Sequence, residues 1–182
     1  DTQGKLTVHA SVQHIFGLRE KLAYVLDMPE SRIKVVKPPY IGGAFGSKLD
    51  LVYIEPLAAL LSLKTRRPVR MEHSRYEDFI TNARHPMQVY LKTGVKKDGT
   101  FTARYAKTIV DTGAYATHGP EVIMVHAVFS IFSAYRCPNQ KWDGLVVYTN
   151  NMLGGAFRGY GAPQGCWAVE SQIDEICHAM QL

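Results

Sequence analysis

The sequence predicts an α+β fold: a mixed sheet with packed helices and an inserted β-hairpin. Three observations indicate this class: segments of alternating apolar residues, segments with apolar residues at helical spacing, and one clear hairpin. The 182 residues are 46% hydrophobic and 20% charged, which is ordinary for a globular chain with a core. We expect residues 1–182 to form a single domain, because this length is ample for one core and short for two.

The first half of the chain alternates predicted strands and helices. Pro56 would break the centre of a helix, so the helix around it either starts near this residue or is kinked in its first turn. The predicted elements are a strand at 6–10, a helix at 15–26 ended by Met28-Pro29, a strand at 32–36, a helix at 51–64, a strand at 69–72 and a helical turn at 76–80.

The second half contains the clearest local signal, a hairpin turn at Lys97-Asp98-Gly99 between two alternating segments. The predicted elements are strands at 87–93 and 101–110, a buried helix at 121–133, a strand at 144–149 and a helix at 163–180. The last helix has an apolar set made of Trp167, Val169, Ile173, Ile176 and Met180.

Charge and cysteine usage disfavour several function classes. The net charge is +5, and the Lys and Arg residues are scattered, so nucleic acid is not an expected partner. The three cysteines, Cys137, Cys166 and Cys177, form no C-x-x-C pair and offer no zinc or iron–sulfur site. Their odd number favours a reducing compartment, so we expect a cytoplasmic location. The most apolar run, residues 122–135, is too short and mixed to span a bilayer.

Two glycine-containing turns carry the functional signal, residues 42–48 (GGAFGSK) and residues 156–164 (AFRGYGAPQ). Each follows a β-rich stretch and leads toward a predicted helix, so each can present backbone N–H donors beside a positive helix end. Neither turn has the spacing of a Walker A loop or of the G-x-G-x-x-G fingerprint. Each alone is compatible with a tight strand-to-helix connection, whereas two together favour one anionic cofactor gripped from two sides.

These two turns, with Ser11-Val12-Gln13 ahead of the first, resemble the molybdenum-binding subunit of the xanthine dehydrogenase family. That family includes aldehyde oxidases, carbon monoxide dehydrogenase large subunits and nicotinate dehydrogenases. Residues 67–70 (RPVR) and 84–86 (RHP) also fall where the family has similar runs. The likeness covers nearly the entire chain in the same order.

The resemblance implies a molybdopterin cofactor whose dithiolene sulfurs hold the metal, with no protein side chain as a metal ligand. It implies that Gln13 donates a hydrogen bond to the apical oxo ligand; a polar residue at a helix entry is the alternative. Whether the pterin carries a cytosine dinucleotide is left open. The implied cofactor contacts are Gly43, Ala44, Phe45 and Gly46 from the first turn, and Ala156, Phe157, Arg158 and Gly159 from the second.

Two of these contacts have open points. Ala44 stands where the family more often has a third glycine, and alanine is tolerated unless the residue needs a positive φ. Arg158 contributes through its main chain or pairs structurally with a helix end.

Three substrate positions follow from the same resemblance. Leu49 replaces a glutamate that hydrogen-bonds purines, so a purine-reading site is not expected. Tyr160 matches an aromatic residue that stacks on the substrate ring and adds a polar hydroxyl. His126 falls near the position of a substrate-orienting arginine, with a core histidine as the alternative. Asp50 either mimics the missing acid out of register or complements a helix N-terminus.

The implied activity is oxidation of a carbon centre, in an aldehyde or an N-heterocycle, with oxygen derived from water. The general base of that reaction, a glutamate, is expected outside these residues, so we expect the chain to be inactive alone. The chain begins without Met and stops within a helical pattern, so we expect a fragment or processed part of a larger molybdenum subunit. The remaining half would complete the subunit, and iron–sulfur clusters and FAD would reside on partner domains or subunits.

The isolated chain should expose surface meant for those partners and should self-associate. Two alternative classes are a noncatalytic structural or subunit-interaction domain on the same scaffold, and an enzyme that binds nucleotide phosphates.

Overall fold

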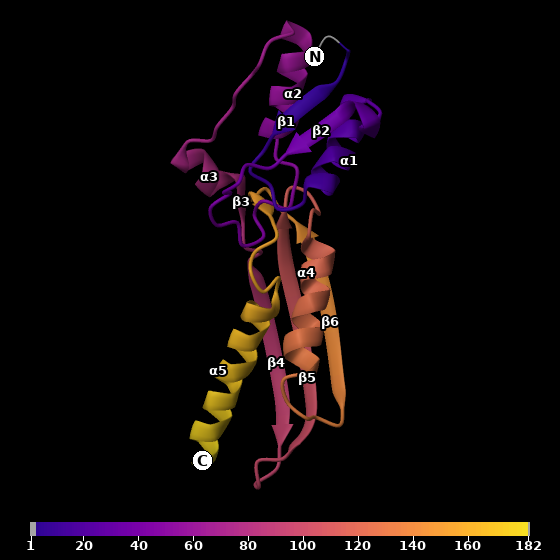
Figure 1. Cartoon of the computed structure of the whole chain (residues 1–182). Coiled ribbons are helices and arrows are strands. Elements are labelled where there is room, and N and C mark those ends of the chain that lie inside the picture. The colour runs from indigo at the N-terminus through magenta and orange to yellow at the C-terminus, as the bar shows by residue number, and fades with distance from the viewer. Residues whose placement is uncertain (1–2, 182) are drawn as a thin grey trace. The chain divides into compact units, whose positions relative to one another are not determined.

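The computed structural model describes residues 3–181 and divides the chain into two compact units, residues 1–79 and residues 80–182 (Figure 1). Each unit has its own cluster of buried apolar side chains. The sequence predicts a single domain, whereas the structure separates two cores. Both units combine helices with strands, and the three-stranded sheet of the second unit has one antiparallel and one parallel pair, which confirms the predicted α+β class.

The first unit is built on a short parallel sheet. Strand β1 (Leu6–His9) pairs with β2 (Ile33–Val36), and helix α1 (Ile15–Leu26) with the 3₁₀ turn η1 (Glu30–Arg32) connects them. Leu18 and Leu22, one helical turn apart, are the buried residues of α1. They pack with Leu6, Ile33 and Ala59, and the last of these lies on α2 (Ile54–Thr65).

The details of α2 answer one open point of the sequence. Pro56 is the third residue of this helix, where its missing N–H needs no intrahelical partner. The Glu55 carboxylate accepts a hydrogen bond from Val52 N at 3.0 Å and closes the N-terminal end. The helix therefore starts near Pro56, and Arg66 ends it in a left-handed conformation.

One predicted strand of this region is wrong. Residues 69–72 form no strand, although their burial alternates as the pattern predicts, because within residues 3–181 no strand pairs with this segment. The predicted helical turn lies within α3 (Arg75–Thr81).

The second unit contains a three-stranded sheet in the order β4-β5-β6. Strands β4 (Met87–Val95) and β5 (Phe101–Gly113) form the predicted antiparallel hairpin, and Gly99 takes φ 84° in its turn. Strand β6 (Gln140–Tyr148) runs parallel to β5 and begins four residues earlier than predicted. A two-residue pair, β3 (Asn82–Ala83) with β7 (Leu153–Gly154), lies at the base of the second glycine turn.

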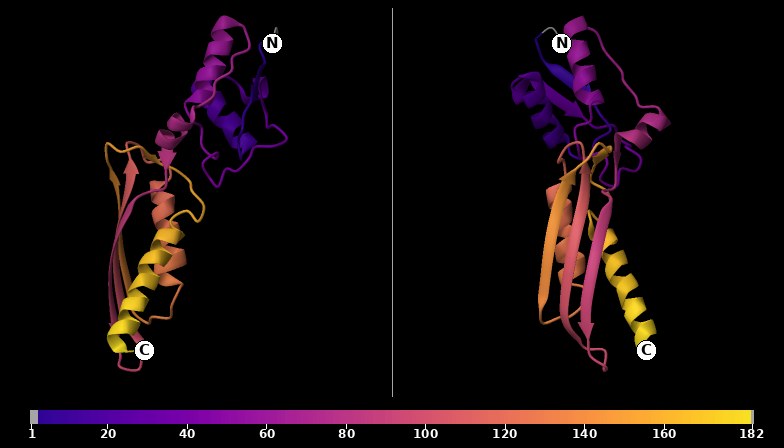
Figure 2. Two further views of the ribbon diagram at one scale, coloured as in Figure 1. Left: turned by 90° about the vertical axis from the view of Figure 1, so that its left-hand side faces the viewer. Right: turned by 180° about the vertical axis from the view of Figure 1, so that it is seen from behind.

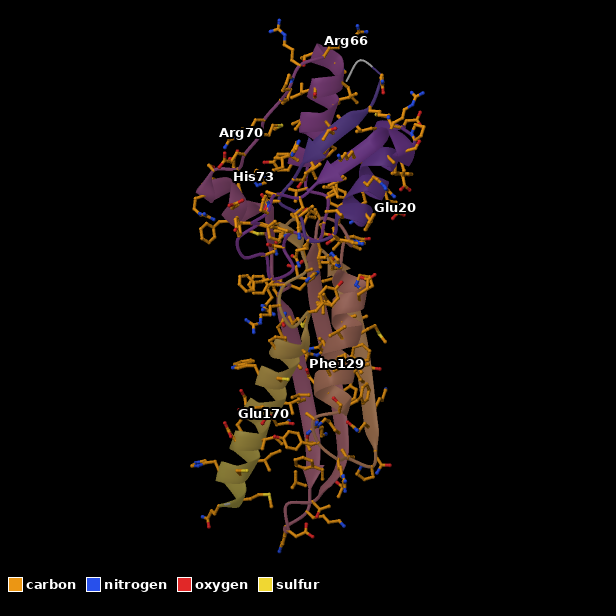
Figure 3. The ribbon with its side chains drawn as sticks, viewed as in Figure 1. Glu20, Arg66, Arg70, His73, Phe129 and Glu170 are labelled. Carbon is orange, nitrogen blue, oxygen red and sulfur yellow. The ribbon has the colours of Figure 1, made fainter. Side chains whose placement is uncertain are left out.

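Helices cover one face of this sheet and leave the other face bare (Figure 2). The predicted helix at 121–133 forms as α4 (Gly119–His126), continued by the π-helix η2 (Ala127–Phe132). Helix α5 (Ala162–Met180) packs beside it, and Val169 of α5 joins Ala106 and Ile131 in the core. Glu170 on α5 and Phe129 on η2 are labelled in Figure 3.

The predicted apolar set of α5 is wrong in one member. Trp167 is 75% exposed, whereas Val169 is fully buried. The buried face of α5 follows Gly165, Val169 and Ile173 at four-residue spacing, and position 167 lies off that line. Gly165 belongs to this face because a Cβ there would come within 3.0 Å of Ser130 and His126.

Candidate functional site

The first glycine turn is built from two successive reversals in the first unit. Ser47 N donates to Ala44 O at 3.0 Å, and Leu49 N donates to Gly46 O at 3.0 Å. The backbone takes positive φ at Gly42 (65°), Phe45 (53°) and Gly46 (106°). A left-handed phenylalanine is costly, by about 1–3 kcal/mol, and such strain clusters at ligand sites.

The same turn displays an aromatic ring instead of burying it. The Phe45 side chain is 59% exposed, and its ring crowds the α-carbon of Gly43, where a Cβ would clash with it. Ala44 is absent from the residues with positive φ, so alanine fits here where the family more often has glycine. Helix α2 begins only at Ile54, so no helix N-terminus lies directly behind this turn.

Gln13 is clamped onto the first turn by three hydrogen bonds. Its Oε1 accepts from Gly46 N at 3.0 Å and from Lys48 N at 3.3 Å, and its own N donates to Lys48 O at 2.9 Å. Two backbone donors fix which end of the amide is the oxygen. The exposed Gln13 side chain therefore presents its Nε2 group as a neutral hydrogen-bond donor beside the turn.

Lys48 stabilises the first turn through its side chain, a role that the sequence does not reveal. Its Nζ donates to Ser11 Oγ at 2.9 Å and to Ile41 O at 2.5 Å. The only signal for this contact was the presence of both Ser11 and Lys48 in the resembling motifs. The neighbouring Leu49 is 39% exposed. Asp50 lies 3.6 Å from Lys21 Nζ of α1, which gives its carboxylate an ion-pair partner.

The second glycine turn, in the second unit, has three consecutive residues with positive φ: Gly159 (86°), Tyr160 (49°) and Gly161 (99°). Ala156 is buried, whereas Phe157 and Arg158 are exposed. The turn closes through Tyr160 N to Phe157 O at 2.7 Å, and the predicted helix follows as α5, which begins at residue 162, one residue earlier than predicted.

Arg84 clamps the second turn by three contacts, and the sequence assigned it no role. Its Nη2 donates to Arg158 O at 2.9 Å and its Nη1 to Gln164 Oε1 at 3.3 Å. Its guanidinium also lies 4.4 Å from the centre of the Phe157 ring. Arg158 thus contributes its carbonyl to the structure, while its exposed guanidinium takes no part in this contact.

His126 has the geometry of the core histidine that the sequence left as an alternative. It is fully buried, with Nε2 2.9 Å from Thr108 Oγ1 and Nδ1 3.3 Å from Gly161 O. Burial lowers the pKa of its imidazole. Both ring nitrogens are engaged within the protein, so we do not carry His126 forward as a substrate residue.

The predicted site residues therefore fall into two groups. The first unit brings together Gln13, the residues 43–46 and Leu49, and the second brings together residues 156–159 and Tyr160. Among residues 3–181, no group of three or more His, Cys, Asp or Glu side chains is placed to hold a metal ion. Over the same residues, no helix is both long and apolar enough to cross a membrane.

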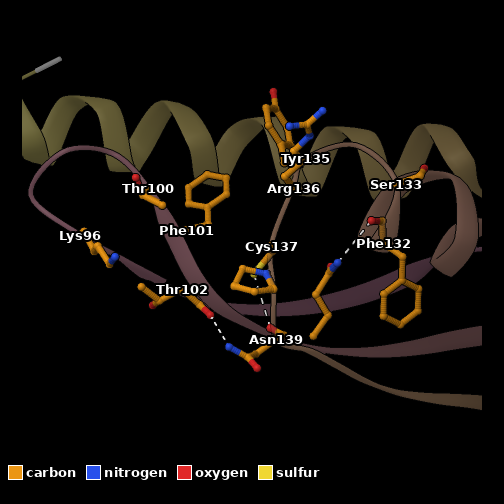
Figure 4. Close-up of a pocket in the computed structure, with 12 residues that line it drawn as sticks. Lys96, Thr100, Phe101, Thr102, Phe132, Ser133, Tyr135, Arg136, Cys137 and Asn139 are labelled. Carbon is orange, nitrogen blue, oxygen red and sulfur yellow. Dashed lines mark hydrogen bonds between the residues drawn. The ribbon is translucent and has the colours of Figure 1, made fainter.

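A separate hollow of about 740 Å³ lies beside the turn of the β4–β5 hairpin (Figure 4). Its lining includes Phe101, Tyr135, Cys137 and Asn139. Asn139 Nδ2 donates to Thr102 O at 2.9 Å and holds the strand connection there. None of the residues that the motifs single out lines it.

Comparison with known proteins identifies the family of the chain. The chain matches the molybdopterin cofactor-binding domain family over residues 1–182. It is 41% identical over 180 residues to a probable xanthine dehydrogenase subunit of Bacillus subtilis (strain 168), covering 97% of this chain and 23% of that protein. It is 40% identical over 181 residues to the nicotinate dehydrogenase large molybdopterin subunit of Eubacterium barkeri, covering 99% of this chain and 42% of that protein.

The fold is also that of a solved structure. The aldehyde oxidoreductase of Desulfovibrio gigas superposes over 100% of this chain and 20% of its own, with a TM-score of 0.92 and 30% identity. The chain therefore spans less than half the length of each of these three relatives.

The protein is thus a cofactor-binding domain of the molybdenum oxidoreductase class. More narrowly, the chain belongs to the family of molybdopterin cofactor-binding domains found in the molybdenum subunits of the xanthine dehydrogenase family.

Proposed function

We propose that this chain is the part of a molybdenum hydroxylase that contacts the metal end of molybdopterin, and that it works only within a larger subunit. The proposal is supported by the family membership and, above all, by the orientation of Gln13. An exposed amide whose oxygen is held by two backbone N–H groups is a fixed donor that carries no charge. Such a donor fits an oxo group, and a charged residue would change the electron density on the metal.

The residues present fit the cofactor in two further ways. The first turn keeps Gly42 open, with nothing within 4 Å of a Cβ there, so a ligand can approach the backbone closely. The second turn is held rigid by Arg84, which leaves the exposed residues 157–159 as a preformed wall. Bound molybdopterin would supply two-electron redox chemistry at a carbon centre.

We assign the roles of the chain's own residues accordingly. Gln13 would donate a hydrogen bond to an oxo group of the cofactor, and residues 43–46 and residues 156–159 would each contact the cofactor through their main chains. Leu49 offers an apolar wall, so the substrate carbon belongs to an aldehyde or an N-heterocycle that is not recognised through a carboxylate at this position. Tyr160 stacks on the substrate.

The small share of each relative that the chain covers supports a larger assembly. We propose that the rest of the molybdenum subunit supplies the general base, and that iron–sulfur clusters and FAD on partner domains or subunits carry electrons away. The pterin is plain molybdopterin or its cytosine dinucleotide form, and the location is cytoplasmic.

The test separates the two functions of the Gln13 amide, in the complete enzyme that contains this chain. Gln13→Glu keeps an acceptor for the two backbone N–H groups and removes the donor, whereas Gln13→Ala removes both. We expect Gln13→Glu to retain molybdenum and pterin but to lose about 10²–10³ in kcat, the usual cost of one lost donor at a site of developing charge. Gln88→Glu, on β4, is the matched control.

Two results would contradict the proposal. Full turnover by the Gln13→Glu variant would show that Gln13 is not part of the site. An enzyme that holds neither molybdenum nor pterin would favour the noncatalytic alternative on the same scaffold.

A further inference from the structure

Tyr160 is held in an unusual backbone conformation within the second turn. Its φ of 49° is left-handed, and glycines with positive φ flank it on both sides. Gly161 packs so closely against α4 that a Cβ there would meet the Val122 carbonyl. A tyrosine in this left-handed region costs free energy, so the contacts of its side chain must offset that cost.

The side chain of Tyr160 is engaged by His118. The phenol hydroxyl is hydrogen-bonded to His118 Nδ1, and the two rings meet edge to face, with centroids 5.4 Å apart and an interplanar angle of 80°. This pair joins the glycine turn to the residue that precedes helix α4, 42 positions away in the sequence.

His118 is itself fixed at a rigid point. It is the N-cap residue of α4, and its carbonyl accepts from Val122 N at 2.9 Å. The preceding Thr117 donates its hydroxyl to Gly154 O at 2.5 Å, which ties the same segment to β7. Because the backbone around His118 is anchored by these two contacts, its imidazole can hold the phenol in one direction, and the Tyr160 ring is oriented before any ligand arrives.

We propose that His118 is a positioning residue that sets the orientation of the Tyr160 ring, and that the enzyme therefore favours planar aromatic substrates over aliphatic aldehydes. The inference rests on the proposed function, in which Tyr160 stacks on the substrate. The hydrogen bond to His118 fixes the direction of the phenol, and the stacking role proposed for Tyr160 uses its ring face. A pre-oriented ring face favours a flat partner, because no side-chain ordering cost is added on binding.

The test is a double-mutant cycle in the complete enzyme, with quinoline and nicotinate as planar probes and propanal as the aliphatic probe. His118→Phe keeps the ring contact and removes the hydrogen bond, and Tyr160→Phe removes the same bond from the other side. We expect each to raise KM for the planar probe that wild type oxidises by about fivefold to tenfold, with kcat changed less than about twofold. The double variant should be no worse than either single one, because both remove one interaction.

Rescue distinguishes positioning from a general structural role. His118→Asn places an amide atom near the position of Nδ1, so KM should return to within about twofold of wild type. His178→Phe, on the exposed end of α5, is the control. A raised KM in Tyr160→Phe with none in His118→Phe, additive effects of the two changes, or equal effects on propanal would overturn the proposal.

A second readout does not depend on activity. Hydrogen exchange at the Tyr160 and Ala162 amides should accelerate equally in His118→Phe and Tyr160→Phe, and no further in the double variant. If wild type holds no molybdenum and oxidises no probe, the proposed function fails, while this exchange cycle still tests the coupling itself. Unchanged exchange in both single variants would show that no such coupling exists.

Discussion

The clamp that Arg84 forms on the second glycine turn gives a prediction whose size follows from the structure. Arg84→Met keeps the aliphatic stem and removes two hydrogen bonds, to Arg158 O and to Gln164 Oε1, together with the contact to the Phe157 ring. Each hydrogen bond contributes about 1 kcal/mol net. The cation–π contact adds about 0.5 kcal/mol, since the Phe157 ring is partly exposed. The turn should therefore lose about 2.5 kcal/mol against local opening.

Hydrogen–deuterium exchange measures that opening directly at the amides of Gly155, Tyr160 and Ala162, all of which are hydrogen-bonded in the folded turn. A loss of about 2.5 kcal/mol corresponds to roughly seventyfold faster exchange when opening is local. Arg158→Met is the matched control, because Arg84 bonds the carbonyl of that residue and not its side chain. Acceleration below about threefold in Arg84→Met, or equal acceleration in the control, would refute the clamp.

Three further predictions concern stability. Gly161→Ala should lower the free energy of unfolding by more than about 2 kcal/mol, because φ is 99° and the new Cβ meets a carbonyl of α4. Gly42→Ala, with open space around the new Cβ, should lower it by about 1 kcal/mol. Thermal unfolding compares the two variants. Thr108→Val should cost about 2–3 kcal/mol in urea unfolding, because its hydroxyl serves both the buried His126 ring and an indole N–H. Burial lowers the pKa of His85 and of His126, so the unfolded chain binds more protons below about pH 6.5. The free energy of unfolding should have its full value above that pH and should fall as the pH drops from about 6.5 toward the lower pKa values of the folded state. An equal urea midpoint above and below this pH range would contradict the prediction.

The parts of the fold that the sequence predicted well are those with local causes. The hairpin at Lys97-Asp98-Gly99 and the helix at 15–26 form as predicted, because turn chemistry and apolar spacing act within a few residues. The strand predicted at 69–72 is absent, since pairing depends on a distant partner that no local pattern reveals. Trp167 was misplaced for a similar reason: the face of α5 that becomes buried is set by Ile131 and its neighbours on other elements.

The candidate site shows the same division. The glycine turns and Gln13 are readable as motifs, because close backbone approach demands particular residue types at particular spacing. The contacts that hold those turns, from Arg84, Lys48 and His118, join positions well apart in the chain and became visible only in the structure. Two separate cores were also not predictable from length, because the boundary near residue 79 carries no compositional break.

Three features of the surface are compatible with a chain that belongs to a larger subunit. Phe129 of η2 and Trp167 of α5 are largely exposed, and one face of the β4-β5-β6 sheet has no helix over it (Figures 2 and 3). Isolated in solution, the chain is expected to self-associate through such surface. Sedimentation across a range of concentrations checks this, and a monomer throughout would count against it.

The central proposal is that each of the two glycine turns contacts molybdopterin in the complete enzyme. Its most direct measurement is the molybdenum and pterin content of the purified complete enzyme, for wild type and for Gly43→Val and Gly159→Val made separately. We predict near-stoichiometric metal and pterin in wild type and a loss of most of both in each variant, with the fold retained by circular dichroism. Full cofactor content in either variant would show that the corresponding turn does not hold the cofactor.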